Sequence, residues 1–162
     1  MSTKVKPIPD GFHTVTPYLT VKGAAEAIDF YKRAFGAKEQ VRMPSPDGKS
    51  IGHAQIVIGD SILMLADEFP HCGKSPQTLN GTPVSLMVYV KDVDAAFKRA
   101  VDAGATVKLP LENKFYGDRS GCVTDPFGHL WTLGTHIEDV PPKEMKKRMA
   151  EFCAKMGATK GT

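Results

Sequence analysis

The sequence predicts an α+β fold: two tandem βαβββ modules whose strands form a curved mixed sheet around a cup, followed by a C-terminal helix. Three observations support this prediction. Short stretches alternate between apolar and polar residues, as strands with one buried face do. Other stretches repeat apolar residues at helical spacing. The order of strand, helix and hairpin then occurs a second time, and the 162 residues suffice for two small modules.

The first module is expected over residues 12–68, after an irregular lead-in over residues 1–11. Its first strand alternates Val15, Leu19 and Val21 with polar residues, and Gly36 ends its helix. Gly59-Asp60 suits the two-residue turn of a tight hairpin. We therefore expect a helix over residues 24–35 and strands over residues 12–21, 37–43, 53–58 and 61–67.

The second module is expected over residues 84–138, after a linker or flap over residues 69–83 that is rich in Pro, Gly, Ser and Asn. Asp125-Pro126-Phe127-Gly128 has the residues of a type I turn. We expect a helix over residues 93–103, strands over 84–91, 106–109, 120–125 and 129–136, and a loop or short strand over 111–118. Residues 139–162 follow as a C-terminal helix through about Phe152 and a frayed tail.

The two halves of the sequence can be aligned. Leu19-Thr20-Val21 matches Val88-Tyr89-Val90, and residues 62–65 match residues 130–133. In each module one helix would cover one face of the sheet and leave the other face open. Two open faces brought together would bury each other around a hollow, and such hollows are common small-molecule sites. Alternation places Thr16, Tyr18 and Thr20 toward the hollow. The repeat matches Trp131 with Leu63, so Trp131 is expected to pack against the helix.

Composition argues against several classes of function. The net charge is only +3, and Lys and Arg are scattered among Asp and Glu, which argues against a dedicated nucleic-acid surface. No apolar stretch is long enough to span a bilayer or to form a signal peptide, so we expect a cytoplasmic protein without a membrane partner. Three widely spaced cysteines indicate buried or incidental thiols.

Three stretches resemble the vicinal-oxygen-chelate superfamily, which includes glyoxalase I, bleomycin-resistance proteins and extradiol dioxygenases. They are Tyr18 to Ala37, Tyr89 to Ala105, and Asp125-Pro126-Phe127-Gly128-His129-Leu130-Trp131. Phe115 to Gly121 and Thr135 to Val140 are similar to a bacterial subgroup labelled PhnB-like. The resemblance implies the tandem βαβββ fold, but it leaves the activity open because this superfamily hosts many chemistries.

The resemblance also implies where a metal ion would bind. Metal-dependent members place one ligand on the first and one on the last strand of each module, typically His, Gln or Glu. The matching positions here are Thr16, Met64, Ser85 and Thr132. Hydroxyl groups are weak donors to Zn²⁺ or Ni²⁺, and a thioether suits only soft ions. We therefore expect no metal and no cofactor, and neither glyoxalase I nor extradiol dioxygenase activity.

Polar residues that face the expected hollow are the candidates for chemistry. His53 could act as a general base beside Gln55, or lie at a strand end in solvent. Arg119 could clamp a carboxylate or phosphate beside Tyr116, or pair with Asp118 or Glu112. A further set could line the ligand site or could simply fill the core: Tyr18, Met87 and Tyr89.

The function hypothesis is a bleomycin-resistance-like protein that binds a small amphipathic molecule in a metal-free cup, as a homodimer. The expected ligand-binding residues are Thr16, Tyr18, His53, Gln55, Met64, Ser85, Met87, Tyr89, Tyr116, Arg119 and Thr132. The alternative is a superfamily enzyme, a lyase, isomerase or transferase, in which His53 or Arg119 is essential. The sequence leaves open whether the two modules pair within one chain or between chains.

Overall fold

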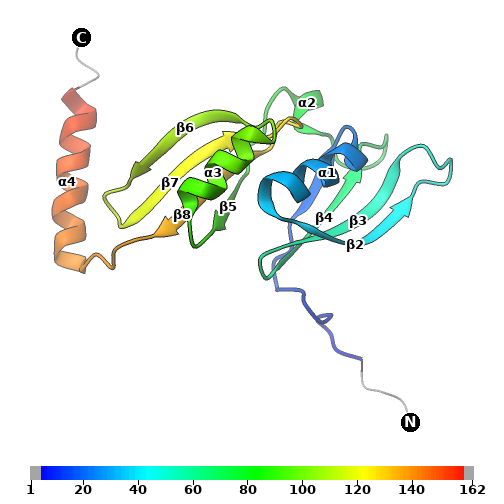
Figure 1. Ribbon diagram of the computed structural model, residues 1–162, viewed down its shortest axis with the longest axis horizontal. Helices are drawn as coiled ribbons and strands as arrows, with labels where there is room; N and C mark the ends of the chain where they lie inside the picture. Colours follow the sequence, from blue (N-terminus) through cyan, green and yellow to red (C-terminus); the bar gives the residue numbers. More distant parts are fainter. Residues whose placement is uncertain (1–4, 159–162) are drawn as a thin grey trace.

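The computed structural model describes residues 5–158 and contains two four-stranded mixed sheets, each with one long helix (Figure 1). In the first sheet, β1 at one edge pairs parallel with β4, and the pairs β4–β3 and β3–β2 are antiparallel, which gives the order β1-β4-β3-β2. Its elements are β1 (Tyr18–Val21), α1 (Ala24–Phe35), β2 (Lys38–Pro44), β3 (Ile51–Ile58) and β4 (Ser61–Asp67). The expected βαβββ order of the first module is confirmed.

The second sheet repeats this topology in the order β5-β8-β7-β6. Its elements are β5 (Ser85–Tyr89), α3 (Val93–Asp102), β6 (Thr106–Asn113), β7 (Asp118–Thr124) and β8 (Leu130–His136). The register repeats as well: Leu19 pairs with Leu65 in the first sheet, and Val88 with Leu133 in the second. These are the positions that the sequence alignment of the two halves equates, so the structure confirms the internal repeat.

Two further helices lie outside the modules. The short helix α2 (Pro76–Leu79) begins in the linker, where the Ser75 side chain accepts a hydrogen bond from the Thr78 amide. The C-terminal helix α4 (Pro142–Ala158) stands apart from both sheets at one end of the molecule (Figure 1). Arg148 anchors it through a two-pronged ion pair with Glu138. No helix within residues 5–158 is long and apolar enough to cross a membrane.

The modules meet through their helix-covered sides. Helices α1 and α3 lie side by side, and one continuous apolar core runs beneath both. Trp131 of this core is fully buried, as expected, and its ring is tilted against that of Phe35 with ring centroids 4.5 Å apart. The open faces, opposite the helices, do not bury each other: Tyr18 is 52% exposed and Tyr89 is 63% exposed. The expectation that open faces close on each other is therefore wrong for a single chain.

Proline explains two differences from the expected strands. The first strand begins at Tyr18 instead of Phe12, because Pro17 restricts the residue before it and supplies no N–H group. Conversely, β6 runs through Pro110, where a strand break was expected. Pro110 is tolerated because β6 lies at the sheet edge and its register shifts on both sides of Leu109. The C-terminal helix continues past Phe152 to Ala158, and the rest of the expected tail lies outside the described residues.

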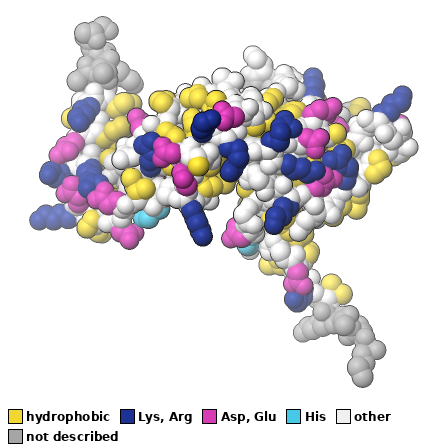
Figure 2. Space-filling view, in the orientation of Figure 1, with side chains coloured by type: hydrophobic (Ala, Val, Ile, Leu, Met, Phe, Trp, Pro, Cys, Tyr) yellow, Lys and Arg dark blue, Asp and Glu magenta, His cyan; other side chains and the backbone are white. Residues whose placement is uncertain are grey.

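Charged side chains of both signs are interspersed over the two helices (Figure 2). On α1, Lys32 lies 2.6 Å from Glu39 of β2 and 3.6 Å from Asp29. On α3, Lys98 pairs with Asp102. This side of the molecule therefore presents paired charges rather than a field of one sign.

Candidate functional site

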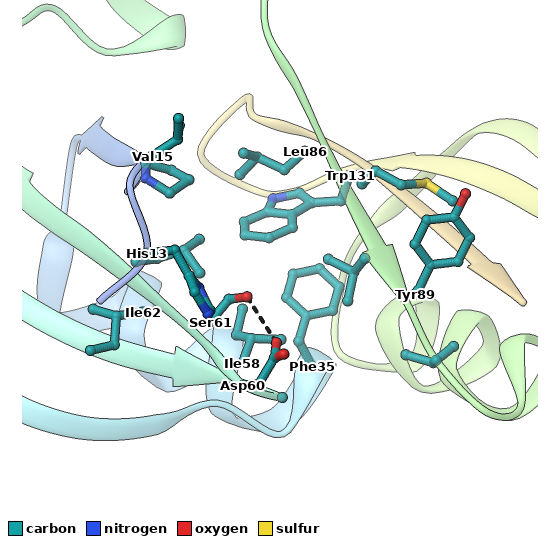
Figure 3. A pocket seen from close by; sticks show the side chains of 16 residues that line it. His13, Val15, Phe35, Ile58, Asp60, Ser61, Ile62, Leu86, Tyr89 and Trp131 are labelled. Carbon is teal, nitrogen blue, oxygen red and sulfur yellow. Dashed lines mark hydrogen bonds between the residues drawn. The ribbon is translucent and has the colours of Figure 1, made fainter. Parts of the chain in front are cut away.

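A pocket of about 540 Å³ lies at the junction of the two modules (Figure 3). Its walls come from the lead-in before β1, the end of α1, the β3–β4 hairpin and strand β5. We call it the junction pocket. The residues that line it are His13, Val15, Pro17, Phe35, Ile58, Gly59, Asp60, Ser61, Ile62, Leu63, Leu86, Met87, Val88, Tyr89, Val90 and Trp131.

The floor of the junction pocket is apolar. Phe35 and Trp131 belong to the aromatic cluster of the shared core, and Leu63 is buried beside them. Leu86 and Val88 of β5 are half-buried and pack against the same core. The floor is held rigidly, because the buried Asp125 carboxylate accepts hydrogen bonds from the Trp131 indole and from the Tyr31 hydroxyl.

The mouth of the junction pocket is polar. His13 projects from the lead-in, and Asp60 and Ser61 come from the tip of the β3–β4 hairpin (Figure 3). The Ser61 hydroxyl donates a 3.0 Å hydrogen bond to Oδ1 of Asp60. Gly59 adopts a positive φ of 62°, which lets this two-residue turn fold tightly. The pocket therefore combines an apolar floor with a small set of polar groups at its rim.

Tyr89 at the rim belongs to a hydrogen-bonded chain on the open face of the second sheet. Its hydroxyl donates to Oδ2 of the buried Asp118 at 2.8 Å. Nδ1 of His136 lies 2.7 Å from the other oxygen of Asp118, and its Nε2 lies 3.0 Å from Asp139. The hydrogen bond to Asp118 raises the pKa of Tyr89. Hydrogen bonds to Asp118 and then to Asp139 raise the pKa of His136.

Gly134 leaves space on the open face of the second sheet for the side chain of Met87. It pairs with Tyr89 in the ladder between β5 and β8. A Cβ atom added at Gly134 would lie 2.5 Å from the terminal methyl group of Met87 and 3.5 Å from Cβ of Ser120. The absence of a side chain at Gly134 therefore leaves room for the end of the Met87 side chain over β8.

A second polar network lies on the open face of the first sheet. The Tyr18 hydroxyl and Nδ1 of His53 are hydrogen-bonded at 2.9 Å, and Nε2 of His53 lies 3.1 Å from Gln55 Nε2. Partial burial raises the pKa of Tyr18. The expectation that His53 and Gln55 share a face with Tyr18 is confirmed, although this face is not enclosed in a single chain.

The other expected site residues are distributed over both modules. Met87 and Tyr89 line the junction pocket, whereas Tyr116 is exposed in the loop between β6 and β7. Arg119 turns to the helix side, where its guanidinium binds both carboxylate oxygens of Asp94. Its partner is thus neither Asp118 nor Glu112. Because Asp94 occupies the guanidinium fork, the structure gives no support to an anion clamp at Arg119.

The expected metal positions do not provide a suitable donor set. Met64 pairs with Tyr18, and Thr132 with Met87, on the open faces of the two sheets. Thr16 lies before β1, where its hydroxyl donates to the His13 carbonyl. With the exposed Ser85, these are three neutral hydroxyl groups and a thioether, which do not fit a divalent ion. Within residues 5–158, no three His, Cys, Asp or Glu side chains gather as a metal-binding group.

Sequence reasoning missed the residues at the mouth of the pocket and the carboxylate behind Tyr89. The sequence indicates only a turn at Asp60, a strand at Ser61 and the end of a loop or short strand at Asp118. Asp118, Ser120 and Cys122 alternate along β7 and are all buried, although two of them are polar or charged. The sequence carries no apolar and polar alternation across these positions, so it gave no signal that Asp118 is a strand residue on the open face.

Comparison with known proteins shows what the chain is similar to. A family model described as Glyoxalase/Bleomycin resistance protein/Dioxygenase superfamily matches residues 11–133. The uncharacterized protein Rv0887c of Mycobacterium tuberculosis is 48% identical over 140 residues, which cover 84% of this chain and 82% of that protein.

Solved structures share the fold. TioX from Micromonospora sp. ML1 superimposes with a TM-score of 0.61 at 30% identity, covering 77% of this chain and 99% of TioX. A PhnB protein from Bacillus cereus has a TM-score of 0.59 at 18% identity, covering 76% of this chain and 99% of its own, which shows a common fold alone. Helix α4 lies beyond the range that the family model matches.

Proposed function

Because this chain belongs to the Glyoxalase/Bleomycin resistance protein/Dioxygenase superfamily, we propose that it binds a small amphipathic molecule, without a metal ion, in the junction pocket between its two modules. One observation carries the proposal: this pocket joins an apolar floor to a polar mouth. Small-molecule sites in proteins commonly have this composition, with volumes of about 300–1,000 Å³. The volume of about 540 Å³ lies within that range.

The floor and the mouth would recognise different parts of such a molecule. An apolar body would displace water from Leu63, Leu86 and Val88, and each square ångström of apolar surface buried contributes about 25 cal/mol. The polar groups of His13, Asp60 and Ser61 would fix its orientation at the rim. The rigid floor supports this role, since a pre-formed pocket loses little entropy when it is filled.

The single tryptophan of the chain provides a direct test. Trp131 is part of the floor of the pocket, so a bound aromatic or aliphatic compound should shift or quench its fluorescence and raise the melting temperature. In the Leu86→Phe variant the enlarged side chain should narrow the pocket and weaken binding. Val107→Phe, on the exposed edge strand β6, is the matched control. Equal binding by both variants would argue against this location.

The network around His53 favours one alternative, a superfamily enzyme in which this imidazole moves a proton. Both of its ring nitrogens have partners, Tyr18 and Gln55, on an accessible face. Under this alternative His53→Ala abolishes turnover of a substrate, whereas a binding protein retains its ligand affinity. Elemental analysis of the purified protein would separately test whether it carries a divalent metal.

A homodimer is part of the proposal. Large apolar side chains are exposed on the open faces: Tyr18, Met43, Met87 and Tyr89. A second copy could cover them and complete an enclosed cup, and the two modules of one cup would then come from different chains. Sedimentation equilibrium tests this directly. Dimers are expected for the unmodified chain and monomers for Tyr18→Glu, while Glu39→Gln serves as a control at a polar position.

A further inference from the structure

The junction pocket has an asymmetric charge. Among the described residues that line it, Asp60 alone carries a formal charge at neutral pH, and none is Lys or Arg. The pocket therefore presents a negative rim above an apolar floor. A ligand with a carboxylate or phosphate group would bring a second negative charge to this rim, which costs free energy.

The hydroxyl protons near the pocket are already engaged. The Ser61 hydroxyl donates to Oδ1 of Asp60, and the Tyr89 hydroxyl donates to Asp118, away from the pocket. The other oxygen of Asp60 retains acceptor capacity, because an ionised carboxylate accepts several hydrogen bonds and donates none. Apart from His13, whose imidazole can donate or accept, the side chains at the mouth thus accept from a ligand more readily than they donate to it.

Both observations favour one class of ligand. We propose that the junction pocket selects amphipathic amines, with an apolar body over Leu63 and Leu86 and an ammonium group against Asp60. This inference rests on the binding function proposed above and adds the chemical class of the ligand. An ammonium group supplies hydrogen-bond donors together with a positive charge, so it satisfies both features of the rim. The ring of Tyr89 at the same rim can also contact a cation.

Three compounds of equal size separate charge from apolar contact: phenylbutylamine, phenylbutanol and phenylbutyrate. Each is titrated into the unmodified protein at pH 8, where an ordinary imidazole is neutral, with Trp131 fluorescence and melting temperature as readouts. The amine is expected to bind about fivefold more tightly than the alcohol, the size of effect that an exposed charge pair gives. The carboxylate is expected to bind most weakly, and added salt should reduce the differences.

Asp60→Asn is the decisive variant. Asn suits the same hairpin turn and can accept the hydrogen bond from Ser61, so the fold should be retained. The amine should lose its advantage of about fivefold, while the affinity for phenylbutanol should stay unchanged. Asp102→Asn is the matched control, since it removes an exposed carboxylate that pairs with Lys98 on α3.

The outcomes separate the two proposals. If phenylbutyrate binds as tightly as the amine, or if Asp60→Asn keeps the preference for the amine, the inference about ligand class is overturned and the pocket remains a binding site. If none of the three compounds changes either readout, the binding function of the pocket is overturned, and the ligand class with it.

Discussion

The hydroxyl group of Tyr31, in the first module, donates a 2.8 Å hydrogen bond to the buried carboxylate of Asp125, in the second. The Trp131 indole donates to the same oxygen, and the amides of Phe127 and His129 donate to the other. Burial, and then the charge of Asp125, raise the pKa of Tyr31 well above its usual value. One carboxylate thus accepts four hydrogen bonds and holds the interface between the modules together.

Removing the Tyr31 hydroxyl tests the strength of this connection. Tyr31→Phe keeps the ring in the aromatic cluster but deprives the Asp125 carboxylate of one donor. We expect the free energy of unfolding to fall by about 1–3 kcal/mol, the cost of an unpaired buried polar group. Urea denaturation followed by Trp131 fluorescence measures it. Tyr116→Phe removes a hydroxyl group from an exposed residue and should change the free energy of unfolding much less. Equal losses for the two variants would contradict the role of Asp125 in connecting the modules.

Two glycines of the second sheet should differ in their tolerance of a methyl group. A Cβ atom at Gly121 would lie 2.7 Å from the Phe97 ring and 3.1 Å from two backbone atoms, so Gly121→Ala should destabilise the fold by about 1–3 kcal/mol. At Gly134 the close neighbour is the flexible end of Met87, so the stability cost should be smaller. Thermal denaturation ranks the two variants, and a larger loss for Gly134→Ala would refute the reasoning.

The contribution of Glu39 to the free energy of unfolding should be lost in acid. Hydrogen bonds from Arg42 and then Lys32 lower the pKa of Glu39 from 4.5 to about 2. A lowered pKa gives stability that is present above pH 4.5 and is lost as the pH falls toward 2. Because both cations are more than a third exposed, we expect the loss to be only about 1 kcal/mol. Urea denaturation between pH 4.5 and 2 should show that the free energy of unfolding falls less steeply for Glu39→Gln than for the unmodified protein.

His136 should titrate above the usual range of a histidine. Its hydrogen bonds to Asp118 and Asp139 favour the imidazolium, so the pKa is raised from 6.5. Stability from this group is then complete below 6.5 and is lost as the pH rises through the higher folded value. NMR titration of the ring protons measures the midpoint. Asp118→Asn should lower it, and an unchanged midpoint would show that Asp118 does not set the charge of His136.

Periodicity in the sequence was sufficient to predict the modules. Alternation along β1 placed Leu19 and Val21 in the core and Tyr18 on the open face, and the internal repeat placed Trp131 opposite the open face of its own sheet. These residues obey local rules, because the side-chain period of a strand is two wherever one face is buried.

The junction pocket could not be predicted in the same way. It forms where the β3–β4 hairpin approaches β5, and these segments are more than twenty residues apart in the sequence. Which sides of two modules meet depends on the packing of α1 against α3, and no periodicity reports this. The Arg119 side chain illustrates the difficulty, since its partner Asp94 lies 25 residues away and only the fold brings them together.

The shared carboxylate of Asp125 has a consequence for the history of the chain. Copies that arose by duplication could at first diverge independently. Once Tyr31 of one copy donates a hydrogen bond to a turn of the other copy, a substitution at either position affects the stability of both halves. A single module can therefore no longer satisfy this buried carboxylate by itself, because the donors to Asp125 come from both halves of the chain.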